Sequence, residues 1–277
     1  MSSVAEIVEE VRRYEKAEIR APPDDKLVKA CNELGGTITS RGYWDFKRDV
    51  YVIEGKEDWV CVVKREGQKH HEVIDEVADV IEKYRPTGRF EFDLASGEME
   101  FKVKEGIIDD FRAWYSDLGN ANEFIEEYDP SEDDFWEWLE DVILGVKLSP
   151  EERRRILEEA SLIVSGRKFE EYLNEEFMRT EEWENYSILS KLGLNMRLGY
   201  TAYGGVYPII EGRDVKIAPD DLRRLKKVFE DFEDVKEGGN GSGLIYDIHQ
   251  ACNRAEQDTW IDAIKEAMKR LGYKIEK

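Results

Sequence analysis

The segment 48–67 contains two short apolar runs, with a carboxylate at the start of the first and a lysine near the end of the second. The letters RDVYVIEGKEDWVCVVKREG predict two strands around a turn, with Asp49 opening the first strand and Lys64 near the end of the second. Mg²⁺ prefers oxygen ligands, and a nearby lysine offsets charge that develops on a phosphate. These residue types suit Mg²⁺-dependent phosphodiester cleavage, which also needs a carboxylate on the neighbouring strand. Val62, two residues before Lys64 on the same strand face, stands where that carboxylate is required.

The elements that would hold these residues alternate between helix and strand over about the first 105 residues. Asp24 or Asp25 is expected to cap the second helix, and the glycines at 35 and 36 are expected to end it. The expected helices are 2–17, 24–34 and 70–84, and the expected strands are 37–47, 49–55, 58–66 and a hairpin over 89–104.

Three features of this region occur together in a familiar order. The helix DDKLVKACNELGG has Asp24 in its first turn, Asp49 opens RDVYVI, and Lys64 ends VVK. In this combination the segment 22–104 resembles the archaeal Holliday junction resolvases, which have the restriction-endonuclease-like nuclease fold. The resemblance implies an αβββαββ domain in which Asp24, Asp49 and Lys64 form the catalytic site. It further implies that Asp24 and Asp49 hold Mg²⁺ if the site is active.

Two substitutions depart from the family pattern. Arg48 replaces the proline that usually precedes the strand aspartate, and Val62 replaces the glutamate of the E-x-K motif. Because valine offers no ligand atom, the resemblance implies a domain that has lost its chemistry and needs no cofactor. Alternatively, a carboxylate has relocated, and the candidates in reach by sequence are Glu54, Glu72 and Asp75. A rival placement of the same motif consists of Asp93, Glu100 and Lys102.

Aromatic and basic residues are interleaved in the early strands, as in surfaces that stack bases and contact phosphates. Residues 26–69 carry nine basic and seven acidic side chains, whereas the whole chain has a net charge of −22. The structural alternative is that half of the aromatic residues are core. The predicted nucleic-acid-binding residues are Arg41, Tyr43, Trp44, Lys47, Arg48 and Arg65.

From about residue 106 the sequence predicts a mainly helical domain with a small β element near 195–217. The first of its helices is expected at 107–119. The stretch 122–141 is strongly acidic, and Phe135, Leu139, Val142 and Val146 in and just beyond it follow helical spacing that predicts burial. This stretch is either a solvated helix face or a docking surface for a basic protein partner. The whole chain is thus predicted to be α/β, or α+β overall, with domains 1–105 and 106–277.

Composition limits the setting of the protein. Cys31, Cys61 and Cys252 are odd in number and widely spaced, so the sequence predicts no disulfide framework. No apolar run resembles a signal peptide or approaches the roughly 18 residues of a membrane span. We therefore expect a cytoplasmic protein without a membrane partner. Abundant Glu, Lys and Arg with few Gln and His are typical of a thermophile.

Three functions are consistent with these patterns. The first is a catalytically degenerate nuclease-like domain that binds DNA or a protein, for example in replication or recombination of a mobile element such as an archaeal plasmid or virus. The second is an active Mg²⁺-dependent endonuclease with a relocated carboxylate. The third is an acidic protein-interaction factor with no role in nucleic-acid binding. The sequence does not predict an oligomeric state.

Overall fold

The chain is a mixed α/β protein, as the sequence predicted. The computed structural model describes residues 3–14, 16–116, 118, 129–164, 166–201 and 205–275. Its contacts divide the chain into two compact units. Unit 1 comprises residues 1–116, 186–197 and 208–233, and unit 2 comprises residues 117–185, 198–207 and 234–277. Each unit therefore combines segments distant in the sequence, which differs from the two consecutive domains expected with a boundary near residue 105.

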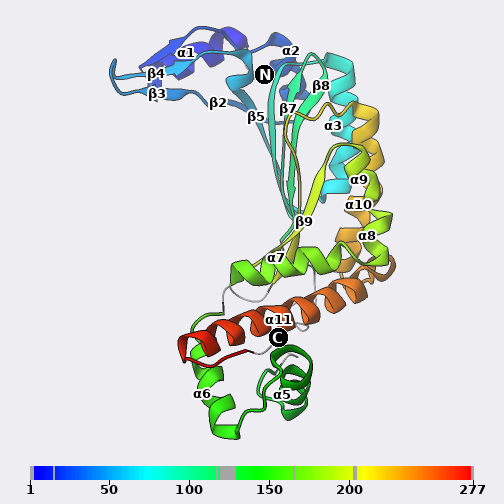
Figure 1. Cartoon of the computed structure of the whole chain (residues 1–277). Coiled ribbons are helices and arrows are strands. Elements are labelled where there is room, and N and C mark those ends of the chain that lie inside the picture. The colour runs from blue at the N-terminus through cyan, green and yellow to red at the C-terminus, as the bar shows by residue number, and fades with distance from the viewer. Residues whose placement is uncertain are drawn as a thin grey trace. The chain divides into compact units, whose positions relative to one another are not determined.

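A seven-stranded sheet of order β2-β5-β6-β7-β8-β10-β9 organises unit 1 (Figure 1). Strand β5 pairs antiparallel with β2 and parallel with β6, while β6, β7, β8 and β10 pair antiparallel in succession. Strands β9 and β10, expected to be part of a separate domain, instead extend this sheet. The strands are β2 (Thr37–Ser40), β5 (Trp59–Arg65), β6 (Gly88–Leu94), β7 (Gly97–Lys104), β8 (Ile107–Trp114), β9 (Asn195–Tyr200) and β10 (Val206–Gly212).

One face of this sheet is apolar and covered by helices. Alternate residues such as Val63, Phe92 and Phe101 are buried, as the period of two in a strand requires. Phe229 of α10 packs against Phe111 of β8, with ring centroids 6.0 Å apart. Figure 1 shows α3 and α10 on the same side of the sheet. The helices of unit 1 are α1 (Val4–Tyr14), α2 (Asp25–Glu33), α3 (His70–Tyr84), α9 (Ser187–Lys191) and most of α10 (Pro219–Lys236), and the short helix η1 is Lys56–Asp58.

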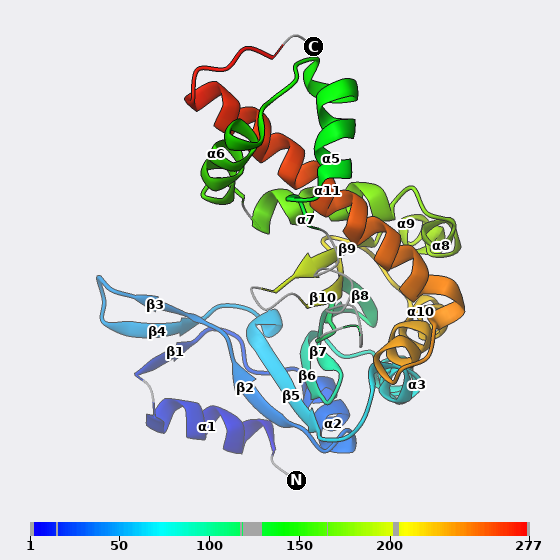
Figure 2. The ribbon, with the colours of Figure 1, turned by 90° about the horizontal axis from the view of Figure 1, so that it is seen from below.

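A smaller sheet of order β1-β4-β3 forms an arm of unit 1 (Figure 2). Its strands are β1 (Ala17–Ile19), β3 (Tyr43–Asp45) and β4 (Val50–Ile53). The single strand expected over 37–47 was wrong, because the chain leaves the large sheet after Ser40 and enters the arm at Tyr43. Gly42 permits this crossing, since a Cβ there would overlap the carbonyl oxygen of Val52. The hairpin of β3 and β4 extends away from the seven-stranded sheet (Figure 2).

The segment 107–119 is not the helix that its sequence predicted. Residues 107–114 form β8, which pairs with β7 on one side and β10 on the other. Ile108, Phe111 and Ala113 are fully buried against the covering helices. A register irregularity at Lys102-Val103 of the partner strand accommodates the unequal spacing of these residues. The apolar spacing fits a helix equally well, so the two flanking strands decided the outcome.

Two of the three cysteines are joined, which corrects the expectation of no disulfide. Cys31 of α2 and Cys61 of β5 form a disulfide with their Cα atoms 5.6 Å apart, and Cys252 is free and buried. The helix packs directly on the strand in the core, so thirty residues of separation in sequence become one contact in space. Spacing along the chain could not show this, because the pairing depends on how α2 meets β5.

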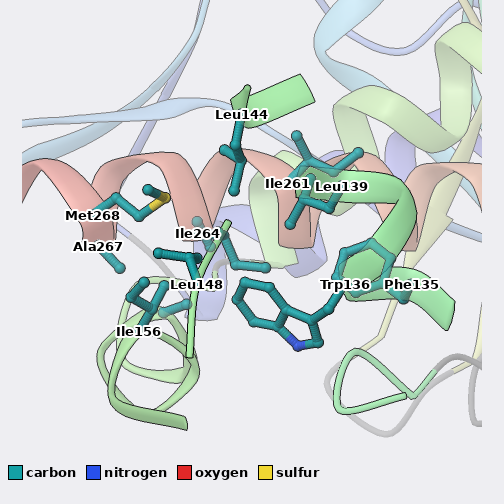
Figure 3. Close-up of a cluster of buried hydrophobic side chains, with 12 residues drawn as sticks. Phe135, Trp136, Leu139, Leu144, Leu148, Ile156, Ile261, Ile264, Ala267 and Met268 are labelled. Atoms are coloured by element: carbon teal, nitrogen blue, oxygen red, sulfur yellow. The ribbon is translucent and has the colours of Figure 1, made fainter. Parts of the chain in front are cut away.

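Unit 2 is mainly helical and has its own apolar core (Figure 3). Within it, Phe135, Leu139 and Leu144 are buried, whereas Val142 is 52% exposed and its predicted burial was wrong. The segment Leu139–Leu144 is a π-helix, whose wider turn places Leu144 rather than Val142 toward the core. The helices are α5 (Asp133–Trp138), α6 (Pro150–Ser161), α7 (Gly166–Phe177), α8 (Glu181–Asn185), η3 (Gly241–Gly243) and α11 (Leu244–Arg270).

Part of the acidic stretch 122–141, residues 122–128, lies outside the described residues. Among the residues that are described, no helix has both the length and the apolarity needed to cross a bilayer.

Candidate functional site

Asp24 acts as a structural cap in unit 1. Its Oδ1 accepts a hydrogen bond from the backbone N–H of Lys26 at 3.3 Å, and its Oδ2 accepts one from the N–H of Thr87 at 3.0 Å. The first bond confirms the predicted cap of α2, and the second ties that helix to the segment before β6. Both carboxylate oxygens are therefore engaged by backbone donors.

Asp49 lies in the turn of the arm and not at the start of a strand in the large sheet. It is the last residue of the turn between β3 and β4, has a positive φ of 51°, and is followed directly by β4. Its Oδ2 lies 3.4 Å from the Nζ of Lys16, and both side chains are more than two-thirds exposed. Asp49 and Lys64 thus belong to different sheets, so the structure does not bring together the three residues that the resemblance names.

Lys64 lies in a polar cleft of about 220 Å³ on the uncovered face of the seven-stranded sheet. Val62 and Lys64 of β5 face the same side as Glu91 and Asp93 of β6, with Val62 opposite Glu91 and Lys64 opposite Asp93. We call this the sheet cleft. The residues that line it are Arg41, Val62, Lys64, Glu91, Phe92, Asp93, Glu98, Glu100 and Trp114.

The carboxylates of the sheet cleft come from β6 and β7. Glu91 lies opposite Glu100, and Asp93 lies opposite Glu98. Arg41 pairs with Glu91 at 2.5 Å, and Arg89 pairs with Glu100 at 2.7 Å. Asp93 and Glu98 make no ion pair with any residue that the structure describes, which leaves them beside Lys64 as the uncompensated charges of the cleft.

The carboxylates proposed as relocated ligands are all engaged outside the sheet cleft. Glu54 accepts hydrogen bonds from Arg20 and Tyr43 in the arm, Glu72 caps the start of α3, and Asp75 pairs with Lys226. Of the rival motif, Asp93 and Glu100 line the cleft, and Lys102 lies opposite Arg89 one step further along. The structure therefore brings the two acids of the rival motif together in one cleft, which it does not do for Asp24 and Asp49.

The arm exposes three aromatic side chains. Tyr43 is 49% exposed, Trp44 is 38% exposed and Phe46, at the tip, is 88% exposed. Trp59, in contrast, is fully buried and donates its indole N–H to the carbonyl of Ala21 at 3.0 Å. The expectation that part of this aromatic set is core is correct for Trp59, and the others are left on the surface.

The cations near these aromatic residues differ in how far they are already neutralised. Arg48 pairs with Glu18 at 2.5 Å and with Asp45 at 2.7 Å, and its side-chain hydrogen bond lowers the pKa of the Asp45 carboxyl. Lys47 makes no ion pair with a described residue. Arg65 does not belong to this surface, because it reaches Glu76 of α3 at 2.8 Å on the helix-covered side of the sheet.

A buried polar network near the start of α3 was missed by the sequence analysis. The backbone N–H of His70 donates to Oε1 of Glu233 at 2.7 Å, and the ring Nδ1 of His70 lies 2.6 Å from Oγ of Ser96. His71 also contacts Glu233. Burial raises the pKa of the Glu233 carboxyl, but hydrogen bonds from His70, His71 and Ser96 outweigh burial and leave that pKa below its usual value.

This network holds elements together and has no access to a substrate. His70 is fully buried and Ser96 is 3% exposed, so the serine and histidine do not face solvent. The ring of His70 also stacks on Tyr115 with centroids 4.2 Å apart. The carboxylate of Glu233 therefore connects α10 to the start of α3 and to the turn between β6 and β7. Only the adjacent histidines at a helix start were visible in the sequence.

A magnesium site at Asp24 and Asp49 does not fit the geometry, because Asp24 caps α2 and bonds to the segment before β6, whereas Asp49 lies in the turn of the arm. Within the described ranges, no group of three or more His, Cys, Asp or Glu side chains is arranged to hold a metal ion. Comparisons with protein-family models, with curated protein sequences and with solved structures found no match.

Proposed function

We propose that the arm of unit 1 binds single-stranded nucleic acid by stacking bases on its exposed aromatic side chains. The observation that carries this proposal is the exposure of Tyr43, Trp44 and Phe46 on one hairpin. Stacking of a base on a solvent-exposed aromatic ring is favourable, and it is so for every base. None of the three rings belongs to the buried core of unit 1, so each offers area that a base can cover.

The charge of the arm also supports this proposal. Residues 16–20 and 43–55 contain four Lys or Arg and four Asp or Glu, so the arm is neutral in a chain whose net charge is −22. Because Arg48 already pairs with Glu18 and Asp45, few cations remain to contact phosphates. We therefore expect a modest salt dependence, with a slope of log K against log salt of about −1 to −2.

The test is fluorescence anisotropy of a labelled oligothymidine of about 20 nucleotides, longer than one binding site, at low salt. Phe46→Ala and Trp44→Ala should each weaken binding by about fivefold or more, the loss of one stacked base. Tyr246→Ala is the matched control, because Tyr246 is an aromatic residue of unit 2 that is 66% exposed. Circular dichroism of each variant checks that the fold is kept.

Two outcomes contradict the proposal. One is the absence of oligonucleotide binding at low salt, which would leave a protein partner as the occupant of the arm. The other is an equal loss of affinity in Tyr246→Ala and Phe46→Ala, since that would show non-specific contact. Lys47→Glu adds a second readout, because it should weaken binding and flatten the salt dependence without removing a stacking ring.

A second candidate function is metal-dependent cleavage of nucleic acid at the sheet cleft. It is favoured by the position of Lys64 beside Asp93, with Glu98 opposite Asp93 on the next strand. Cleavage of single-stranded and branched DNA with Mg²⁺ or Mn²⁺ tests it. Asp93→Asn should abolish cleavage at this cleft, whereas loss of cleavage in Asp49→Asn alone would restore the assignment that the resemblance implies. No cleavage by the unaltered protein removes this candidate.

A further inference from the structure

Unit 2 contains a cleft of about 480 Å³, within the range of small-molecule sites. We call it the lysine cleft, because Lys168, Lys265 and Lys269 line it. Its apolar lining consists of Ile163, Val164, Ala263 and Ile275. The wall is formed by α11, by the segment that follows α6, and by the chain that follows α11.

The apolar part of the lysine cleft is the outer side of the unit 2 core. Ile163 and Ile275 are partly buried and pack against the cluster of Figure 3, to which Ala263 belongs. Val164 is 39% exposed, and its neighbour Leu162 is 80% exposed. Covering exposed apolar surface contributes about 25 cal/mol of favourable free energy for each Å² removed from water. The cleft therefore offers a floor that favours an aliphatic or aromatic body.

Three lysines and two carboxylates line this cleft, a net charge of +1, although unit 2 as a whole has 30 acidic and 14 basic residues. Lys265 makes no ion pair with a described residue. Lys168 lies 3.7 Å from Glu171 and 3.8 Å from Asp262, and Lys269 lies 3.8 Å from Glu266. Each of the two carboxylates of the lining also has a second partner. Asp262 accepts a hydrogen bond from the hydroxyl of Tyr172 at 2.5 Å, and Glu266 pairs with Arg270 at 3.3 Å.

From this combination we propose that the lysine cleft binds an amphipathic anion, an aliphatic carboxylate whose chain lies on the apolar floor and whose head group contacts the lysine ammonium groups. Each part of the ligand has a matching part of the cleft. The ammonium groups of Lys265 and Lys269 supply charged donors, and charge-assisted hydrogen bonds are stronger than neutral ones.

The test is calorimetric titration of the full chain with decanoate, below its micelle concentration. Decyltrimethylammonium is the matched ligand, because it has the same chain and the opposite charge. Decanoate should bind and the cation should not. In the series from hexanoate to decanoate, affinity should rise by up to about fourfold for each methylene covered by the floor. Binding of both ligands with equal affinity would overturn the proposal, and so would affinity independent of chain length.

Charge-reversal variants distinguish decanoate binding in this cleft from binding elsewhere on the surface. Lys265→Glu and Lys269→Glu should each weaken decanoate binding by about tenfold, the loss of one charged hydrogen bond. Lys191→Glu in α9 of unit 1 is the control, because it changes the net charge equally at an exposed residue outside the cleft. Equal affinity in Lys191→Glu and Lys265→Glu would overturn the proposal, as would the absence of any decanoate binding by the unaltered protein.

Discussion

Glu233 of unit 1 and Glu256 of unit 2 are both carboxylates that helices withdraw from water, yet their pKa values move in opposite directions. Glu233 is 2% exposed and receives hydrogen bonds from His70, His71 and Ser96, and its pKa falls below the usual value. Burial raises the pKa of Glu256 to about 7. The Oε2 atom of Glu256 is buried and has no hydrogen-bond partner among the described residues.

The difference shows that donors, and not burial, decide the sign of the shift. Burial disfavours the charged form of any carboxyl, and only hydrogen bonds or cations reverse that preference. In unit 1 the start of α3 supplies a backbone N–H and two histidines in the right place. In unit 2 the neighbours of Glu256 include Cys252, whose own pKa is raised to about 12 by burial and by the Glu256 charge. One carboxylate therefore stabilises its unit when charged, and the other destabilises it.

The largest expected effect is that of Glu233→Ala, which removes the carboxylate that receives hydrogen bonds. The variant leaves the buried N–H of His70 and the ring of His71 without their acceptor. We expect a loss of about 3 kcal/mol in the free energy of unfolding, the usual cost of removing one partner from a buried charged network. Urea unfolding at pH 7 measures it. A loss below about 0.5 kcal/mol, in the range of ordinary surface substitutions, would contradict the role of Glu233.

The pH dependence of the same carboxylate gives the sign of its contribution. Because the pKa of Glu233 is lower in the folded protein than in the unfolded chain, its contribution is present above the unfolded value. That contribution is lost as the pH falls through the folded value. Glu233→Ala should therefore show a smaller loss of stability on acidification than the unaltered protein does.

Reduction of the Cys31–Cys61 disulfide is expected to have an effect of similar size, and it should destabilise unit 1 and not unit 2. The crosslink closes a loop of 30 residues in unit 1, for which the chain-entropy estimate is about 3.6 kcal/mol, close to the expected Glu233 effect. Hydrogen exchange with and without dithiothreitol measures it. Protection of α2 and β5 should fall on reduction, whereas α11, which carries the free Cys252, should be unaffected. Equal loss of protection in both helices would contradict this assignment.

Glu256→Gln should stabilise the protein, which is the opposite of the effect at Glu233. Since the folded pKa of about 7 exceeds the unfolded value, the carboxyl destabilises the folded state increasingly as the pH rises from about 4.5 to 7. At pH 8 we expect a gain of about 1 kcal/mol, a figure reduced for partial exposure of the side chain. At pH 5 the variant and the unaltered protein should be nearly equal. Urea unfolding at the two pH values provides the test.

The smallest effect is expected for Asp49→Asn, because Asp49 is exposed whereas Glu233 and Glu256 are withdrawn from water. This change removes the exposed pair with Lys16 and keeps a residue that tolerates the positive φ of 51°. The free energy of unfolding should change by less than about 0.5 kcal/mol. A larger loss would show that Asp49 organises the arm beyond its contact with Lys16.

Local signals predicted several elements well. The helix 70–84 is α3, and the helix capped by Asp24 is α2. Each of these depends on residues within a few positions of one another, so nearby sequence carries enough information. Strand β8 shows the limit, because the spacing of Ile108 and Phe111 fits a helix face, and a strand buries both on one face only through the register irregularity opposite them. Its pairing with β7 and β10 lies outside any local window.

The candidate site shows the same limit more strongly. One face of the seven-stranded sheet carries four of the residues that the sequence analysis named, which are Val62, Lys64, Asp93 and Glu100. The alternation of polar and apolar residues along the strands indicated that these side chains point to the same face. Asp49 departs from the predicted site because the chain leaves the large sheet at Gly42 and returns at Trp59. Nothing in the apolar pattern of 37–66 distinguishes three strands in one sheet from strands shared between two.

The sequence by itself determined the α/β class and the bounds of α2 and α3, because these follow from composition and near neighbours. Only the tertiary structure decided which strands pair, which cysteines join, and which carboxylate receives donors. Those outcomes depend on contacts between residues far apart in the chain, and their free energies exist only once the elements have packed.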